Sequence, residues 1–265
     1  MTKSFIDTLK KDILPSKQNL SLAYILGLQD VTQRYKRSAL GPLWLTLSMS
    51  VTISAMGFVF GRIFKIPLHD FFPYLAAGII VWGFISVVLS EGCSVFVDSE
   101  AIIKQIPLPY FTFILRLIWR NLLIFFHNIL IFPFVLWGVG RGFHVESFLA
   151  IPGFVLLLIN LMWIVLILAT LCARYRDMPQ IVLSVIQLIF YVTPVMWMPQ
   201  TLSGEMGRFI QWNPLFHIID IVRSPLLGAM PSSLSWWVSI FMAVMGWLVA
   251  IQFYRRHKHK IAFWV

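Results

Sequence analysis

The sequence predicts an all-α integral membrane protein with six transmembrane helices, and three observations carry that prediction. Hydrophobic residues make up 59% of the 265 residues and charged residues 12%, against roughly 45–50% and 25% in soluble domains. The mean hydropathy is +0.82. Six apolar runs have lengths near the roughly 20 residues that cross a bilayer core. These values argue against a water-soluble fold and leave little chain for a separate extramembrane domain.

The whole chain, residues 1–265, is expected to form one transmembrane domain. Its apolar runs lie near residues 43–61, 74–96, 110–138, 149–172, 180–197 and 234–254. An even number of spans puts both termini on one side, and that side carries fourteen Lys and Arg against five on the other. Because Lys and Arg concentrate in cytoplasmic loops, we expect both termini in the cytoplasm. The same rule explains the net charge of +10 without nucleic acid as a partner.

The stretch before the first span predicts an amphipathic helix over residues 19–38. Its apolar residues recur at helical spacing: Leu20, Tyr24, Leu28, Val31 and Tyr35. A helix with one apolar face and one charged face lies along a membrane interface, here the cytoplasmic one. Leu40-Gly41-Pro42 then breaks it before the first span. Within that span, Gly57 and Gly61 form a GxxxG pair, a signal for close helix packing in lipid.

The segment between the fifth and sixth runs, residues 198–233, is too long for a plain turn and too apolar for a solvated loop. Four prolines punctuate it and leave two short apolar stretches, 202–212 and 215–227. Neither can cross a core of about 30 Å. We expect two short re-entrant helices, an outer gate hairpin beside a pathway, because such backbone survives at membrane depth only where protein or water covers it.

No arrangement in the sequence predicts an enzyme. Ten of the eleven acidic residues fall outside the predicted spans, and Glu91 lies near the inner end of the second. The six His show no ligand spacing, the two Cys form no metal-site pattern, and the common hydrolase and metalloprotease motifs are absent. We therefore expect no catalytic residue, no metal site and no cofactor in this chain.

The same residues indicate that transport needs a partner. Ion-driven carriers keep an ionisable residue near the bilayer midplane, and no acidic residue is predicted there. The sequence also lacks a phosphate-binding loop of the ATPase type. An ATPase, with its ATP and Mg²⁺, would be a separate polypeptide. A passive channel without a partner is the alternative.

A polar stripe marks the third predicted span. Arg116, Arg120 and His127 fall on one helical face, with Asn121 and Asn128 beside them. The two arginines either extend to the inner headgroups, as long basic side chains do in membranes, or line a cytoplasmic portal that attracts an anionic group. The basic residues of the interface helix either join that portal or hold anionic lipid.

Aromatic residues form 15% of the chain. Most fit the interfacial belts of any membrane protein. A subset on the first and fifth spans could instead stack on sugar rings inside a channel: Trp44, Phe58, Phe190, Tyr191 and Trp197.

Four segments together resemble the membrane subunits of ABC-type polysaccharide exporters, the O-antigen, capsule and teichoic-acid export permeases. The segments are QRYKRSALGPLW at 33–44, ARYRDMPQ at 173–180, YVTPVMW at 191–197, and NPL at 213–215 followed by Arg223 and Leu227-Gly228. Their order and spacing match that family over essentially the whole chain.

The resemblance implies a homodimer of six-span permease subunits in the bacterial inner membrane, with two copies of a separate nucleotide-binding ATPase on the cytoplasmic side. The cargo would be a polysaccharide on an undecaprenyl pyrophosphate carrier, with O-antigen favoured over teichoic acid. An exporter for a small molecule or drug is the alternative.

The resemblance also implies roles for individual residues. The portal for the carrier's diphosphate would be formed by Arg34, Tyr35, Arg37, Arg116 and Arg120. The coupling segments that contact the ATPase would contain Asp98, Glu100, Arg174, Arg176 and Asp177. The two short helices after the fifth span would be the gate helices of the family.

Overall fold

The computed structural model describes residues 12–14, 16–36, 41, 43–199 and 210–265. Every regular element in these residues is helical, which confirms the all-α class. In chain order the elements are α2 (Lys17–Tyr35), α3 (Leu43–Ile63), α4 (Leu68–Ser94), α5 (Glu100–Gln105), α6 (Phe111–Ile129), α7 (Ile131–Gly138), the 3₁₀ helix η2 (Val145–Leu149), α8 (Ala150–Arg174), α9 (Met178–Val192), α11 (Pro214–Leu226) and α12 (Ser233–Trp264).

Five of the six predicted spans are helices long and apolar enough to cross a membrane. They are Leu43–Ile63, Leu68–Ser94, Phe111–Gly138, Val145–Arg174 and Ser233–Trp264. The last continues ten residues beyond the predicted end at 254. Apolar length marks where a helix leaves the lipid, whereas the helix itself continues because the Arg and Lys residues that follow are good helix formers.

The fifth predicted span, near 180–197, is a shorter helix. α9 has 15 residues, or about 22 Å at 1.5 Å per residue, against a hydrocarbon core of about 30 Å. Its helix ends at Thr193, which is extended (φ −85°, ψ 134°). The following Pro194 disfavours the helical region for the residue before it. A sixth crossing therefore stays a prediction.

The third predicted span is divided into two helices. α6 ends at Ile129 and α7 begins at Ile131. Pro133 explains the break, because proline has no N–H to donate and its ring crowds the carbonyl four residues earlier, that of Ile129.

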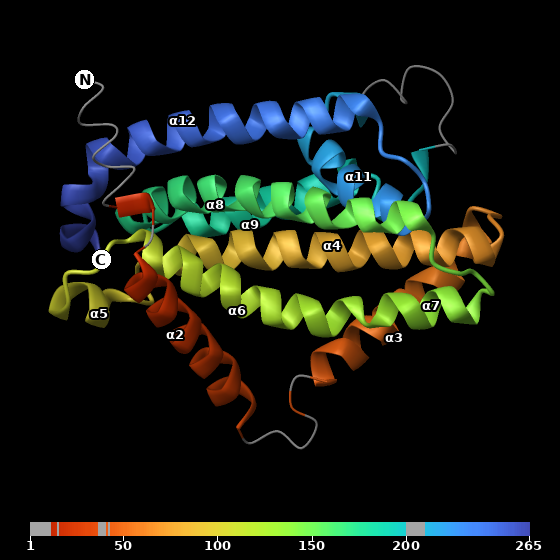
Figure 1. Cartoon of the computed structure of the whole chain (residues 1–265), viewed down its shortest axis with the longest axis horizontal. Helices are drawn as coiled ribbons and strands as arrows, with labels where there is room; N and C mark the ends of the chain where they lie inside the picture. The colour runs from red at the N-terminus through yellow and green to blue at the C-terminus, as the bar shows by residue number, and fades with distance from the viewer. Residues whose placement is uncertain (1–11, 15, 37–40, 42, 200–209) are drawn as a thin grey trace.

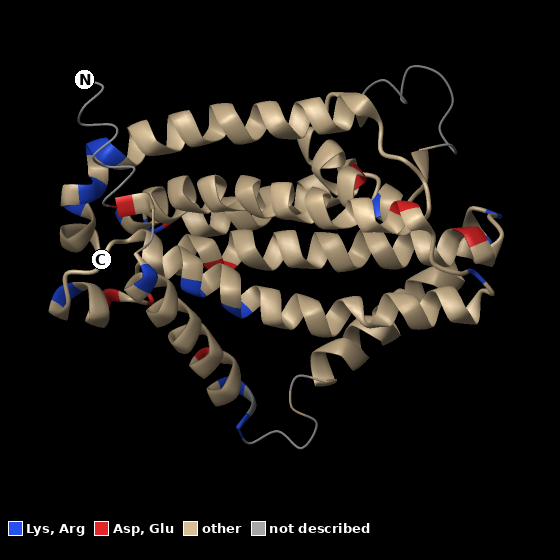
Figure 2. Ribbon diagram, viewed as in Figure 1, with Lys and Arg blue, Asp and Glu red and all other residues tan. Residues whose placement is uncertain are grey.

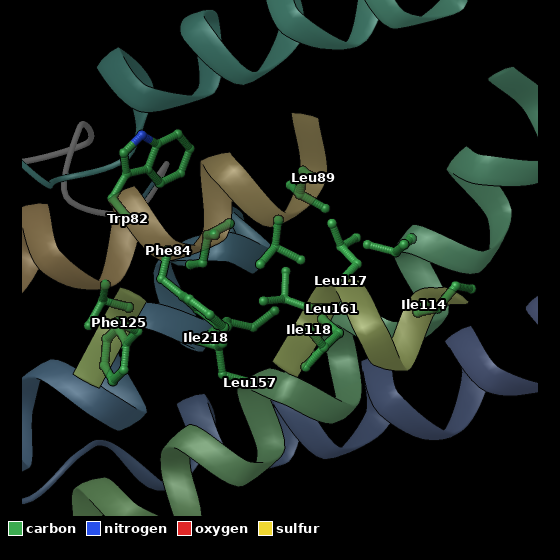
Figure 3. Close-up of a cluster of buried hydrophobic side chains, with 14 of the residues drawn as sticks. Trp82, Phe84, Leu89, Ile114, Leu117, Ile118, Phe125, Leu157, Leu161 and Ile218 are labelled. Carbon is green, nitrogen blue, oxygen red and sulfur yellow. The ribbon is translucent and has the colours of Figure 1, made fainter. Parts of the chain in front are cut away.

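The hydrophobic core forms around α4, which runs through the middle of the bundle (Figure 1) and buries sixteen of its 27 residues. Figure 3 shows side chains of α4 meeting those of α6, α8 and α11: Trp82, Phe84, Leu89, Ile114, Leu117, Ile118, Phe125, Leu157, Leu161 and Ile218. Small residues allow the closest approaches, as expected in lipid. A Cβ at Gly153 of α8 would lie 2.2 Å from the backbone oxygen of Ile221 in α11.

The predicted interface helix is α2, which packs on α6 and, like α3, slants away from the bundle (Figure 1). The face toward α6 contains Ala23, Gly27 and Val31, which are buried. A Cβ at Gly27 would lie 2.9 Å from Cδ1 of Trp119. Leu20, Tyr24 and Leu28 of the apolar stripe are 40–50% exposed. An outward apolar stripe is what a helix in contact with lipid requires.

The two ends of the bundle differ in charge. Among the described residues, most Lys and Arg lie at the end that holds α5 and the C-terminus (Figure 2), which we call the basic end. The opposite, far end holds α11, a short helix packed against α8, α12 and α4. Asn213 caps α11 by accepting a hydrogen bond from Leu215 N (3.0 Å), and Pro214 occupies the first helical position. The other predicted short helix, 202–212, lies mostly outside the described residues, so the gate hairpin over 198–233 stays a prediction.

Candidate functional site

Toward the basic end, α2 and α6 are joined by a two-pronged ion pair. Nε and Nη2 of Arg116 donate to the two carboxylate oxygens of Asp30 at 2.8 and 2.6 Å. Both side chains are at least three-quarters buried. Paired guanidinium–carboxylate bonds of this kind are among the stronger and more directional polar contacts in proteins.

A second acid extends the contact to α4. Arg120 Nη2 and the amide of Asn121 both donate to Glu91 Oε2 at 2.8 Å. Arg120 Nη1 lies 3.5 Å from Asp30, and Arg34 Nη1 lies 3.7 Å from Glu91 Oε1. These residues form the basic-end cluster: Asp30, Arg34, Glu91, Arg116, Arg120 and Asn121.

The basic-end cluster has an excess of donors. Three guanidinium groups face two carboxylates. Arg120 Nε is buried without a hydrogen-bond partner among the described residues. A cavity of about 50 Å³ lies against Glu91, Arg116 and Arg120. The cluster therefore has both the charge and the donor to bind an additional anion.

The structure thus brings together three of the five predicted portal residues: Arg34, Arg116 and Arg120. Arg37 and the side chain of Tyr35 lie outside what the structure describes. Sequence reasoning missed Asp30 and Glu91 as partners. The available signal was the four-residue spacing of Asp30 and Arg34, which puts an acid and a base on the face of α2 that α6 could meet. In the structure carboxylates hold the arginines, so headgroup contact is not needed to keep them at this depth.

Four of the five predicted channel aromatics lie on α3 and α9, and Trp197 lies in the turn after α9. α3 buries three of its 21 residues, and no residue of α9 is buried. Trp44, Phe58 and Tyr191 are 54–59% exposed. Phe190 packs on Trp82 with ring centroids 5.6 Å apart. A single chain therefore does not enclose these rings, and their contact with a channel stays a prediction.

The predicted coupling residues lie at the basic end in two segments. In the first, Asp98 accepts from Ser94 Oγ (2.6 Å), and Glu100 pairs with Lys104 Nζ (2.5 Å) on α5. α5 also contacts α12.

The second coupling segment is the exposed turn of residues 174–177, which contains Arg174, Arg176 and Asp177. The guanidinium of Arg174 lies over the rings of Tyr175 (5.0 Å) and Trp264 (5.5 Å). Both segments thus touch or neighbour the end of α12 and leave charged side chains exposed.

A second polar cluster, which the sequence did not reveal, lies at the far end. Arg223 of α11 is 3% exposed. Its Nη1 donates to the Pro194 carbonyl at 2.5 Å, and its guanidinium lies 4.2 Å from the ring centroid of Tyr74. The Tyr74 hydroxyl donates to the same carbonyl (2.8 Å) and lies 3.2 Å from that of Trp197.

The acid of the far-end cluster is held by hydroxyls. Asp220 accepts hydrogen bonds from Ser224 (2.6 Å) and from Ser235 of α12 (2.7 Å). His217 contacts the same Ser235 hydroxyl at 3.0 Å. The far-end cluster, which comprises Tyr74, His217, Asp220, Arg223 and Ser235, joins α4, α11 and α12 to the turn after α9.

The sequence matches the model of the ABC-2 type transporter family over residues 22–227. The chain belongs to this family. It is similar to the polysialic acid transport protein KpsM of Escherichia coli, with 24% identity over 85% of this chain and 88% of that protein. It is also similar to the O-antigen export system permease protein RfbA of Klebsiella pneumoniae, with 22% identity over 93% and 98% of the two chains. RfbA of Myxococcus xanthus is 24% identical over 76% and 78%.

These matches confirm the resemblance to the membrane subunits of polysaccharide ABC exporters. They also agree with the apolar helices of the structure, which make this ABC-2 member a multi-pass membrane protein. Members of this kind are the membrane subunits of transporters and not the ATPases themselves.

Proposed function

We propose that this ABC-2 permease moves a lipid-linked polysaccharide, on undecaprenyl pyrophosphate, from the cytoplasm to the periplasm, with O-antigen as the favoured class. The observation that carries the proposal is the similarity over 85–93% of the chain to a polysialic acid transporter and an O-antigen export permease. The protein resides in the bacterial inner membrane with both termini in the cytoplasm, and the basic end, which holds the C-terminus, faces the cytoplasm.

The active unit is a homodimer. The lightly buried helices α3 and α9 support this, because their apolar side chains form a surface that a second copy could cover. In such a dimer the exposed rings of Trp44, Phe58 and Tyr191 would face a shared passage. Aromatic rings suit a moving polymer, because they stack on successive sugars without a fixed hydrogen-bond pattern.

Energy comes from two copies of a separate nucleotide-binding subunit, which would hold ATP and Mg²⁺. α5 and the turn at 174–177 are exposed at the same end of the bundle, as a docking surface requires. Asp98 and Asp177 are the acids that this surface offers to basic partner residues.

The basic-end cluster is the portal for the carrier's diphosphate. It carries one more positive than negative group, and Arg120 Nε is buried without a hydrogen-bond partner among the described residues. Arginine is the residue best suited to bidentate phosphate contacts. Phosphate would compete with Asp30 and Glu91 for the same guanidinium groups.

Reconstitution tests the proposal. The permease and its partner nucleotide-binding subunit are placed in proteoliposomes with lipid-linked glycan, and ATP hydrolysis and glycan translocation are followed together. We expect glycan-stimulated hydrolysis and ATP-dependent translocation. A rate of ATP hydrolysis that does not change when glycan is added, together with no translocation, would contradict the proposal.

A further inference from the structure

A cavity of about 440 Å³ lies between α3, α4 and α6 and shares Arg34, Glu91 and Asn121 with the basic-end cluster. The rest of its lining is mostly apolar and includes the hydroxyls of Ser48, Thr52 and Ser90. The volume falls within the roughly 300–1,000 Å³ of small-molecule sites.

The cavity exists because α3 packs against α4 with only one half of its length. The buried residues of α3 are Ile53, Gly57 and Gly61. A Cβ at either glycine would lie 2.6–2.7 Å from Phe72 or Leu68 of α4, so the contact there is close. The first ten residues of α3, 43–52, contain no buried residue. This half borders the cavity.

The three hydroxyls that line the cavity offer it acceptors only, beside the guanidinium of Arg34 and the amides of Asn121 and Asn128. The hydroxyls of Ser48, Thr52 and Ser90 donate to backbone carbonyls of their own helices at 2.9, 2.9 and 3.1 Å. Because a hydroxyl has one proton, only its lone pairs remain for the cavity.

Two acceptors at the cavity lack a hydrogen bond. Asn128 is 8% exposed, and its Oδ1 is buried without a hydrogen bond among the described residues. Glu91 Oε1 forms an ion pair with Arg34 Nη1 at 3.7 Å but accepts no hydrogen bond from a described side chain. Acceptors without a hydrogen bond favour a ligand that brings donors.

The remaining lining is apolar and elongated. On α4 it runs from Glu91 to Ile79, twelve residues or about 18 Å, which is near the half-thickness of a core of about 30 Å. The charged end holds one carboxylate and one guanidinium. This pattern matches an amphiphile with a positive donor group, a phosphate and a hydrocarbon chain.

We infer that this cavity binds a glycerophospholipid of the phosphatidylethanolamine class from the leaflet at the basic end. Its ammonium would donate to Glu91 Oε1 and its phosphate would accept from Arg34. An acyl chain would run along Ile80, Phe84 and Phe125. The lipid would stabilise the first half of α3, residues 43–52, which has no buried residue. The lipid would share Arg34 and Glu91 with the proposed diphosphate portal, but the inference does not depend on the identity of the cargo.

Lipid titration of the purified permease, followed by native mass spectrometry, tests this inference in the absence of any glycan. Phosphatidylethanolamine is compared with phosphatidylcholine of the same chains, which has the same net charge but no N–H donor, and with phosphatidylglycerol. We expect phosphatidylethanolamine to bind at least about tenfold more tightly than phosphatidylcholine, because bonds to charged groups are lost. Equal binding of the three lipids, or no retained lipid, would overturn the inference in favour of ordinary boundary lipid or water.

Two variants locate the site. Thr52→Phe fills the cavity from α3 and should abolish the preference for phosphatidylethanolamine. Asn128→Leu removes the unpaired acceptor; the lipid-free protein should unfold at the same or a higher temperature, and the added thermal shift from phosphatidylethanolamine should shrink. The matched control is Ser54→Phe, on the same helix but in the neighbouring apolar cavity beside Phe72, which should keep the preference.

Retention of the full preference in both Thr52→Phe and Asn128→Leu would overturn the assignment. The variant Thr52→Cys gives a further test. If it formed a disulfide between two copies of the chain in good yield in native membranes, the second copy would occupy the cavity, and the assignment would be overturned.

Discussion

The two polar clusters of this permease stabilise buried charged side chains in opposite ways. In the far-end cluster, Arg223 meets a backbone carbonyl and an aromatic ring, and Asp220 meets two hydroxyls. In the basic-end cluster, three arginines share two carboxylates at distances from 2.6 to 3.7 Å, and one donor is left over. The first has fixed partners, whereas the second has surplus charge and can exchange partners. We expect the far end to provide stability and the basic end to respond to ligands.

The largest loss of stability should follow Arg223→Leu. The change removes a charge-assisted hydrogen bond and the contact with Tyr74, and leaves a space in a buried region. We expect a loss of about 3 kcal/mol or more, measured as a lower thermal unfolding midpoint in detergent. The matched control is Arg141→Leu at the same end, whose ion pair with Asp70 is partly exposed and should contribute under about 1 kcal/mol. Equal shifts in the two variants would refute the assignment of Arg223 as a structural anchor.

A smaller loss should follow Asp30→Asn, because the amide oxygen of Asn can still accept one of the two hydrogen bonds from Arg116. We expect about 1.5–3 kcal/mol, the range for hydrogen bonds to charged groups. A double-mutant cycle with Arg116→Gln isolates the pair, and the coupling energy should be about 1–3 kcal/mol. Additive single effects would show that α2 is not held to α6 by this contact.

The smallest change in stability should follow Asp177→Arg, because the turn at 174–177 is exposed. The unfolding midpoint should shift by no more than the equivalent of about 0.5 kcal/mol, yet export should fall while ATP hydrolysis by the partner persists. Glu146→Arg reverses a charge at the far end and should leave export intact. Normal export by Asp177→Arg would remove this turn from the coupling surface.

The fold was largely predictable because apolar length is a local property of the sequence. Five spans follow from it directly. The shortened α9 and the divided third span depend on Pro194 and Pro133, whose effects on helices are also local, although apolar length alone did not reveal them. The contact between α2 and α6 was not predictable in this way. Only the structure shows that Ala23, Gly27 and Val31 are buried, whereas Tyr24 stays half exposed although its ring centroid lies 5.0 Å from that of Trp119 in α6.

The clusters were less predictable, because their partners are far apart in sequence. Arg116 and Asp30 are 86 residues apart, and Arg223 and Pro194 are 29 apart. The sequence marked Arg116 and Arg120 as unusual because they lie in an apolar helix. It could not indicate which acids meet them, since that depends on how α2 and α4 pack around α6. Arg223 falls in the predicted short helix 215–227, but nothing in the sequence indicates that its side chain is buried against Tyr74.

The central claim is that the basic-end cluster exchanges its carboxylates for the diphosphate of the cargo. The direct measurement is the concentration of lipid-linked glycan that gives half-maximal ATP hydrolysis by the reconstituted complex. In the double variant Arg116→Lys with Arg120→Lys, charge is kept but bidentate contact is lost, and the concentration should rise about tenfold or more. Asp30→Asn removes a competitor and should lower it. If the half-maximal glycan concentration were the same as in the wild type in both variants, the claim would be contradicted and the cluster would have a purely structural role.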